Sequence, residues 1–272
     1  MICKFLSALA LLATLGACTT APVVTSQRPL PVEAGAAPDV KSPAPDAGIA
    51  SSPWAVQSSP QAGKPSRWQH YPLLGKAATK FNYSRKDGRD AVAVTAQSSA
   101  SMLRRVVRIE PMDLGSVRFS WKVPELIQGA DLGQRDAADS PVRIVLAFEG
   151  DRSKFSPKNA MLSELAHALT GEPMPYATLM YVWCNQREPG TVIVSPRTDR
   201  IRKLVVESGA RKLNQWLDYE RNIRADFIKA FGESPGALVG VAIMTDTDNT
   251  HSTANAWYGP VRLAPTLAQA SR

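Results

Sequence analysis

Cysteine and histidine are scarce in this chain, and their scarcity excludes the common metal and disulfide frameworks. The 272 residues include 3 Cys and 3 His, with neither a CxxC motif nor a Cys/His pair at zinc-site spacing. Cys3 and Cys18 lie in the N-terminal segment, so Cys184 alone remains for the rest of the chain and an internal disulfide is excluded. Cys184 ends the apolar run "TLMYVWC" and is predicted to be a small buried hydrophobe.

Several functional motifs are missing as well. After the N-terminal segment no apolar run approaches the roughly 18 residues that a membrane span needs. There is no G-x-S-x-G motif of serine hydrolases. No RNP motif, zinc finger or repeated basic–aromatic run occurs, so no nucleic-acid partner is predicted. The formal net charge of +8 favours anionic partners such as acidic glycans or lipid headgroups.

The N-terminus has the pattern of a secretory signal. A short basic start, Met1–Lys4, precedes an apolar stretch that ends at Leu15, so residues 1–17 are predicted to be a signal peptide. The tetrapeptide "LGAC" that ends at Cys18 resembles the lipobox of bacterial lipoproteins. The resemblance implies cleavage before Cys18 and acylation of this residue, which anchors the protein in a membrane. Thr19, in place of Asp, implies the periplasmic face of the outer membrane.

The composition changes along the rest of the chain. Residues 18–66 are rich in Pro, Ala and Ser and poor in large apolar side chains. Such a segment buries too little apolar surface to offset the entropy of ordering, so a disordered tether is predicted. Residues 67–272 are expected to form a single domain, since this length suffices for one core.

Most of this domain has the two-residue period of β-strands. "TKFNYS" and "RDAVAVTAQ" flank the turn Lys86–Gly88, which is a hairpin signal. About ten such strands, separated by Gly, Pro and Asp turns, predict a mainly β fold of the sandwich type.

Two segments have helical spacing instead. Ser156 and Pro157 are expected to begin one helix and Gly171 to end it. In the second, Asn214 is expected to cap a helix that ends at Gly232. Its apolar face is expected to hold Trp216, Tyr219, Ile223, Phe227 and Phe231.

The stretch "TDTDNT" follows an apolar run near the C-terminus and allows several interpretations. Asp246, Asp248 and Asn249 match the first motif of haloacid-dehalogenase-type phosphatases, but too little chain follows for that fold. An EF-hand is excluded, because Trp257 stands where a bidentate Glu is needed. A looser calcium site on Asp246 and Asp248, a contact with an organic ligand, and a loop closed by its own side chains all stay open.

Spacing adds a further expectation for this stretch. Asp246 and Asp248 should point to the same side of an extended chain, where they repel each other unless a cation lies between them. Arg221 of the second predicted helix, or a metal ion, is expected to be that cation. The candidate ligand-binding set is Arg221, Asn222, Asp226, Asp246, Asp248, Asn249 and Trp257. Calcium is the only cofactor considered, and no catalytic residue is predicted.

Ordered pieces across Arg67–Leu263 resemble a known family. They include "RWQHYPL", "SPVRIVLAFEGD", "WLDYERNIRADFIKAFGESP" and "GVAIMTDTDNT". They resemble the bacterial envelope family known as domain of unknown function 3047, which implies no activity and no catalytic residues. The strand order is also similar to that of galactose-binding-type jelly rolls, so the expected fold is a jelly-roll β-sandwich with two accessory helices.

Three functions are compatible with these observations. The first is a non-catalytic binding module that holds a glycan or another envelope component. The second is a hydrolase of an envelope polymer that uses Asp226, Asp246 or Asp248. The third is a structural lipoprotein that contacts another protein.

Overall fold

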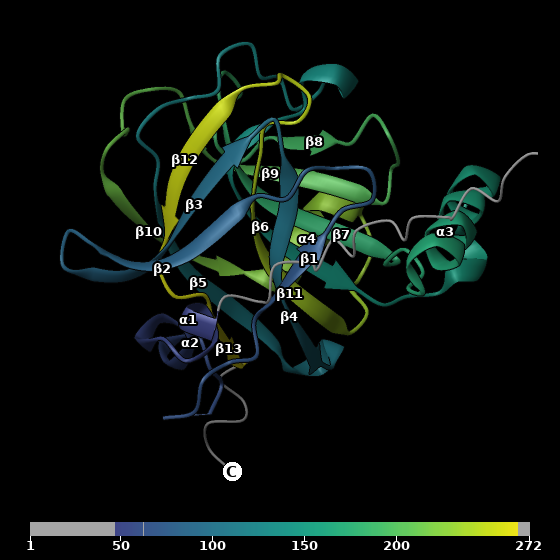
Figure 1. Cartoon of the computed structure of the whole chain (residues 1–272). Coiled ribbons are helices and arrows are strands. Elements are labelled where there is room, and N and C mark those ends of the chain that lie inside the picture. The colour runs from purple at the N-terminus through teal and green to yellow at the C-terminus, as the bar shows by residue number, and fades with distance from the viewer. Residues whose placement is uncertain (1–46, 62, 266–272) are drawn as a thin grey trace, which may run out of the picture. The chain divides into compact units, whose positions relative to one another are not determined.

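The computed structural model describes residues 47–61 and 63–265. Within them, two sheets pack face to face (Figure 1). In spatial order the larger sheet consists of β1 (Gln69–Pro72), β4 (Ala100–Ile109), β11 (Leu238–Asp246), β6 (Ser140–Phe148), β7 (Ala177–Cys184), β9 (Ile201–Ser208) and β8 (Val192–Val194). The smaller sheet consists of β10 (Trp216–Asn222), β5 (Leu114–Lys122), β12 (Thr253–Tyr258), β3 (Arg89–Gln97) and β2 (Lys80–Lys86), and β13 (Arg262–Pro265) also pairs with β5.

Each sheet turns one row of apolar side chains inward, where they form a common core. On β5 the alternate residues Val117, Phe119 and Trp121 are buried, and the ring of Phe119 lies 5.7 Å from that of Tyr181 on the opposite sheet. Consecutive strands β3, β4, β5 and β6 alternate between the sheets, as in jelly rolls. The predicted mainly β sandwich with jelly-roll character is confirmed.

The predicted hairpin is also present. β2 and β3 are antiparallel neighbours, and Lys86 pairs with Arg89 across the turn. Asp87 and Gly88 both have positive φ, 51° and 78°. This is the geometry of a type I′ turn, which Asp-Gly favours because glycine adopts it without strain.

The described residues contain four α-helices and three short 3₁₀ turns. The helices are α1 (Ala47–Ala50), α2 (Pro53–Gln57), α3 (Pro157–Thr170) and α4 (Ile223–Phe231), and the 3₁₀ turns are Pro111–Asp113, Arg135–Ala137 and Arg152–Lys154. None of the helices in the described ranges has the length and apolarity to cross a bilayer.

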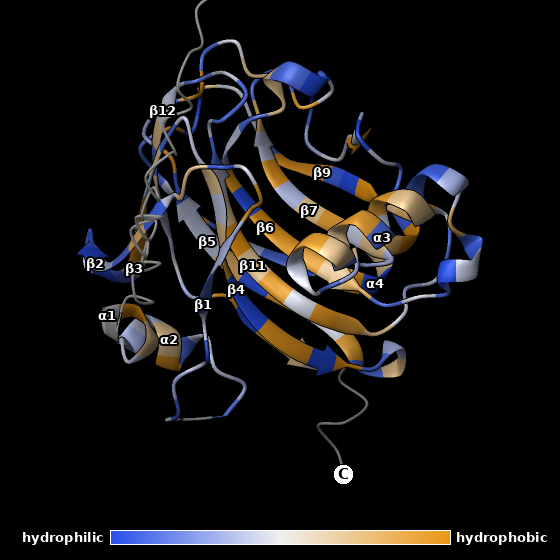
Figure 2. Cartoon of the chain, turned by 45° about the vertical axis from the view of Figure 1, so that its right-hand side comes forward, coloured by the Kyte–Doolittle hydropathy of each residue, from blue (hydrophilic) through white to orange (hydrophobic). Residues whose placement is uncertain are grey.

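Helix α3 begins and ends where the sequence predicts. Ser156 Oγ accepts the backbone N–H of Asn159, and Gly171 ends the helix at φ 75°. The helix buries only Asn159 and Ser163, although its ribbon carries several hydrophobic residues (Figure 2), and three of its apolar side chains are exposed. Those exposed side chains are Met161, Leu165 and Leu169.

The second predicted helix is wrong over its first half. Residues Trp216–Asn222 form β10, an edge strand on which exposed Asp218 and Glu220 alternate with partly buried neighbours. Only Ile223–Phe231 is helical, and it is capped by the side chain of Asn222. The expected cap, Asn214, lies in a turn at φ 61°. The segment is a strand and not a helix because, as a strand, it pairs with the backbone groups along the edge of β5, which would otherwise be unpaired.

The predicted tether is wrong for residues 47–61 and 63–66. α1 and α2 lie at one end of the sandwich (Figure 1), where Trp54 has no exposed surface and packs 4.9 Å from Trp68. Buried Arg105 of β4 donates to the carbonyl of Ser58 and, at 2.8 Å, to Ser66 Oγ. A few apolar residues in a Pro-rich segment therefore suffice to fold it against the sandwich, because their side chains bury apolar surface at that end of the core.

Some predictions on single residues have simple outcomes. Cys184 is a buried, free thiol, as expected. The signal peptide, Cys18 and the tether up to residue 46 lie outside the described residues.

Candidate functional site

The stretch "TDTDNT" begins in the last residues of β11 and leaves the larger sheet after Asp246. The backbone N–H of Thr247 donates to the carbonyl of Ser99 at 3.0 Å. Thr247 Oγ1 accepts the N–H of Ser99 in return, at 3.3 Å. The chain is therefore fixed to the start of β4 at the point where the carboxylates follow.

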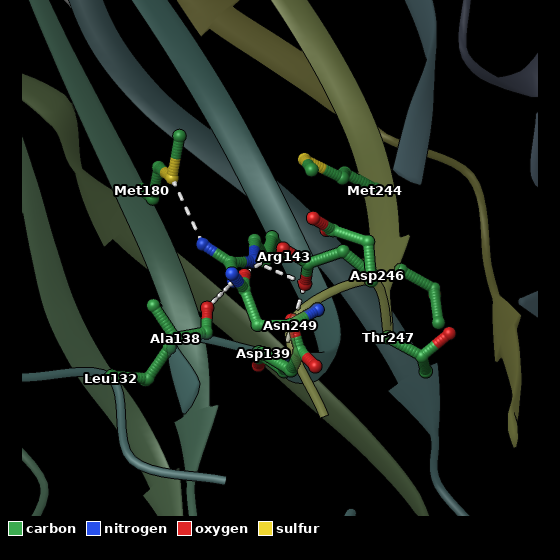
Figure 3. A network of polar contacts seen from close by, with 12 residues as sticks. Leu132, Ala138, Asp139, Arg143, Met180, Met244, Asp246, Thr247 and Asn249 are labelled. Atoms are coloured by element: carbon green, nitrogen blue, oxygen red, sulfur yellow. Dashed lines mark hydrogen bonds and ion pairs between the residues drawn. The ribbon is translucent and has the colours of Figure 1, made fainter. Parts of the chain in front are cut away.

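Asp246 forms a two-point ion pair with Arg143 on the neighbouring strand β6 (Figure 3). Arg143 Nε donates to Oδ1 at 2.9 Å and Nη2 donates to Oδ2 at 2.7 Å. Both residues are buried, at 3% and 5% exposure for Arg143 and Asp246. The cation beside Asp246 is thus Arg143, and the expected pairing with Arg221 is wrong.

The other two carboxylates nearby are also satisfied by protein groups. Asp139 accepts the backbone N–H and the hydroxyl of Thr250, each at 2.7 Å. Asp248 forms an ion pair with Lys76. With its amide oriented so that both ends are satisfied, Asn249 donates to Asp139 at 3.1 Å and accepts from Arg197 at 3.3 Å.

The three carboxylates lie close enough together to be considered as ligands of one calcium ion. Asp139, Asp246 and Asp248 each place one carboxylate oxygen within 4.8 Å of the others. Calcium needs six to eight oxygen ligands, and the oxygens here already accept hydrogen bonds from Arg143, Thr250 and Lys76. The residues fit an internal ion-pair network better than a metal site, and calcium binding stays a prediction.

A second buried cation lies close to this network. Lys203 on β9 is 3% exposed, and its Nζ donates to the carbonyl of Leu132 at 2.7 Å. Burial lowers the pKa of Lys203 to about 7, and the charge of Arg143 acts in the same direction. Burial also raises the pKa of Asp246 to about 6, although Arg143 opposes this shift.

These side chains line one hollow of about 240 Å³ on the outer side of the larger sheet. Its polar lining includes four cationic residues, Lys76, Arg143, Arg197 and Lys203. Its apolar lining includes Leu73, Leu74, Met180 and Met244. Perturbed pKa values inside a hollow are typical of functional sites, so we take this hollow as the candidate site.

The remaining predicted site residues lie elsewhere. Asp226 accepts from Arg221 at 2.9 Å and from Tyr181 at 3.0 Å. Tyr181 points into the core, whereas Met180, the residue before it, contacts Arg143 on the outer side. Adjacent residues of a strand face opposite sides of the sheet, so Asp226 and Asp246 are separated by the larger sheet.

Two further predicted residues have local roles. Asn222 caps α4 by accepting the N–H of Ala225 at 2.9 Å. Trp257 lies on the smaller sheet, with Lys86 Nζ 4.6 Å from its ring centroid. The structure therefore brings Asp246, Asp248 and Asn249 together and leaves the other four outside.

Sequence reasoning missed the two buried cations of the hollow. Arg143 stands within "SPVRIVLAF" and Lys203 within "RKLVVES". Each is a charge inside an apolar strand, where a buried charge is costly unless it has a partner. That cost is the signal that could have identified both residues, since charged side chains are rarely fully buried without one.

Comparisons with known proteins give one clear relationship. No curated protein is significantly similar to the chain. The family 11 carbohydrate-binding module of the cellulosomal cellulase Lic26A-Cel5E of Clostridium thermocellum is 8% identical, with a TM-score of 0.34, over 73% of this chain and 88% of that chain. The xyloglucanase domain of NopAA from Sinorhizobium fredii, solved with cellobiose, is 9% identical, with a TM-score of 0.37, over 73% and 93%.

Likenesses at this level carry no argument about function. The sequence itself matches the profile of one family over residues 66–262, from just before β1 to the start of β13. The matched residues contain the lining of the hollow and strands β1 to β12. The chain therefore belongs to the family described as "Protein of unknown function (DUF3047)".

Proposed function

We propose that this chain is a non-catalytic binding module, anchored through acylated Cys18 at the periplasmic face of the outer membrane. Its ligand is an anionic envelope component, held in the hollow between β11, β6 and β9. The group that enters the hollow is a carboxylate or a phosphate, and an apolar portion of the same ligand follows it.

The observation that carries this proposal is an imbalance between donors and acceptors. The carboxylates around the hollow already accept hydrogen bonds from protein groups, whereas two cations have donors without an oxygen acceptor among the residues that the structure describes. Lys203 Nζ uses one of its three hydrogens, on Leu132. The nearest polar partner of Arg143 Nη1 is Met180 Sδ, at 3.6 Å, and sulfur is a weak acceptor. An anionic oxygen of the ligand is the hydrogen-bond acceptor that these donors lack.

The apolar lining refines the class of ligand. Leu74 is 66% exposed at the hollow, and Met180 and Met244 border it. Methionine adapts its shape to irregular apolar groups. A ligand that joins an anionic group to an acyl chain matches both parts of this lining, whereas a simple inorganic ion matches only one.

The same contacts disfavour the hydrolase. General acid–base chemistry needs a carboxylate that can reach its substrate. Asp246 is held by Arg143 at both oxygens, and Asp226 is occupied by Arg221 and Tyr181 on the inner side of the sheet.

Thermal unfolding of the full chain in phosphatidylcholine nanodiscs tests the proposal. Dihexanoyl phosphatidate is expected to raise the midpoint, dihexanoyl phosphatidylcholine is not, and inorganic phosphate should act only weakly. Lys203→Met should abolish the phosphatidate effect, while exposed Lys80→Met serves as the matched control. An equal shift in Lys203→Met and in the wild type would refute anion binding in the hollow.

A further inference from the structure

The outer face of the smaller sheet carries a row of three large side chains. The register places Trp216 opposite Lys122 on β5, and Lys122 opposite Trp257 on β12. Residues opposite each other on adjacent strands point to the same face. Trp121 and Tyr258, their neighbours in sequence, are buried in the core, so the row faces outward. Two strand spacings, about 10 Å, separate the backbones of the two tryptophans.

The β2–β3 turn holds this row in place. Lys86 Nζ lies 4.6 Å from the ring centroid of Trp257. On the other side of the turn, the guanidinium carbon of Arg89 lies 5.4 Å from the ring centroid of Trp216. Asp87, in the turn itself, pairs with Lys122 at 2.6 Å. Both indoles are only partly buried, so their positions are fixed while part of each ring meets solvent.

A furrow of about 580 Å³ adjoins the row. Its lining includes Gly259 and Ser120, and the N–H of Gly259 donates to the carbonyl of Ser120 at 2.9 Å. A Cβ at position 259 would lie 2.0 Å from Ser120 Oγ, so a larger residue there would displace the serine side chain. The charged and polar side chains along its walls are Gln57, Arg89, Asp90, Arg118, Asp218, Glu220 and Arg262.

The charges along the walls are balanced in pairs. Arg89 donates to both oxygens of Asp218, at 2.8 and 3.0 Å, and Arg118 pairs with Glu220 at 3.0 Å. The carboxylates disfavour a polyanion and the guanidinium groups disfavour a cation. A ligand rich in hydroxyl groups suits such walls, because each hydroxyl both donates and accepts. A sugar ring adds apolar C–H groups that pack on an indole face.

We propose that this furrow and the adjoining tryptophans bind an uncharged stretch of a glycan chain. The inference goes beyond anion binding in the hollow, because the furrow lies on the other sheet and shares no lining residue with it. Failure of one site would therefore leave the other unaffected.

Isothermal titration of the full chain with chitopentaose and with cellopentaose tests the inference. A detergent without a sugar headgroup, lauryldimethylamine oxide, keeps the furrow free of competitors. Trp257→Ala is expected to weaken binding about tenfold, the effect of losing about 1.4 kcal/mol, and Trp257→Tyr should largely restore it. Lys158→Met, at an exposed position of α3 outside both proposed sites, is the control and should bind like the wild type.

Two results would overturn the inference. One is the absence of binding of either oligosaccharide to the wild type at millimolar concentration, and the other is unchanged affinity in Trp257→Ala. If circular dichroism shows that Trp257→Ala is unfolded, Asp218→Ala decides, because Asp218 is exposed and its removal spares the core. Affinity of Asp218→Ala equal to that of the wild type would then reject the furrow as the site.

Discussion

Replacing Lys203 by methionine should make the protein more stable and at the same time remove its anion site. Lys203 is 3% exposed, and burial lowers the pKa of its amine to about 7 in the folded chain, from the ordinary lysine value of 10.5. This shift lowers the free energy of unfolding by about 4 kcal/mol at pH 7. In the unfolded chain the Lys203 amine keeps its proton at no cost, whereas burial penalises the protonated amine in the folded state. A methionine of similar length removes this penalty.

The substitution also has a cost. The carbonyl of Leu132 accepts the hydrogen bond of Lys203, and leaving a buried acceptor without a partner costs about 1–3 kcal/mol. The net gain at pH 7 is then about 1–3 kcal/mol. For a chain of this size, about 2–4 °C of melting temperature corresponds to each kcal/mol.

The pH dependence separates this explanation from a simple gain in packing. The folded pKa of Lys203 lies below the unfolded value, so the unfolded chain binds more protons between about pH 7 and 10.5. The wild type therefore gains stability as the pH rises through this window, whereas Lys203→Met does not. The advantage of the variant should shrink by about 3 kcal/mol between pH 7 and pH 10.

Calorimetry compares Lys203→Met with the wild type at pH 7 and at pH 10. Lys80→Met, at an exposed position, is the control and is compared with the wild type at the same two pH values. A stability difference that stays the same at both pH values would refute the argument, since a neutral or solvated amine gives no such dependence. A less stable variant at pH 7 would show that the bond to Leu132 outweighs the burial of the charge.

Three further predictions concern other parts of the molecule. Asp246→Asn should lower the free energy of unfolding by about 3–5 kcal/mol, because buried Arg143 loses its charge partner. Denaturant titration should give the same loss in EDTA and in millimolar calcium. A calcium effect confined to the wild type would indicate a metal site instead. Trp54→Ala should cost about 3–5 kcal/mol in the same assay, whereas an unchanged midpoint would return the segment to the predicted tether. Cys18→Ala should block lipoprotein maturation and move the protein out of the membrane fraction, and normal membrane retention would contradict the anchor.

Local rules explain which elements the sequence predicted correctly. The Asp87–Gly88 turn depends on two adjacent residues that tolerate positive φ. Helix α3 depends on Ser156 at one end and Gly171 at the other. Neither needs information from a distant part of the chain, so each could be predicted from a short window.

The error at β10 has a non-local cause. Tyr219 fits a helical face that includes Trp216, and it equally fits the inward row of a strand that includes Leu217. The choice depends on β5, which lies about a hundred residues earlier and offers an unpaired edge. Periodicity alone cannot choose between the two.

The candidate site shows the same limit. The sequence predicts that Asp246 needs a cation, and this need follows from like charges close together. The cation itself, Arg143, lies 103 positions earlier in the chain. Only the antiparallel pairing of β11 with β6 brings the two side chains together, and that pairing has no signal in the sequence around either residue.

The packed segment of α1 and α2 sets a limit on the reach of the proposed anchor. A folded region that began at Arg67 would leave about 48 residues after Cys18, with a maximum length of about 170 Å. Ala47 already belongs to α1, so about 28 residues separate it from Cys18, and this stretch cannot span more than about 100 Å. With the proposed anchor at Cys18, the domain would search only the layer within about 100 Å of the bilayer, and an envelope component beyond that layer would have to come within this range to be bound.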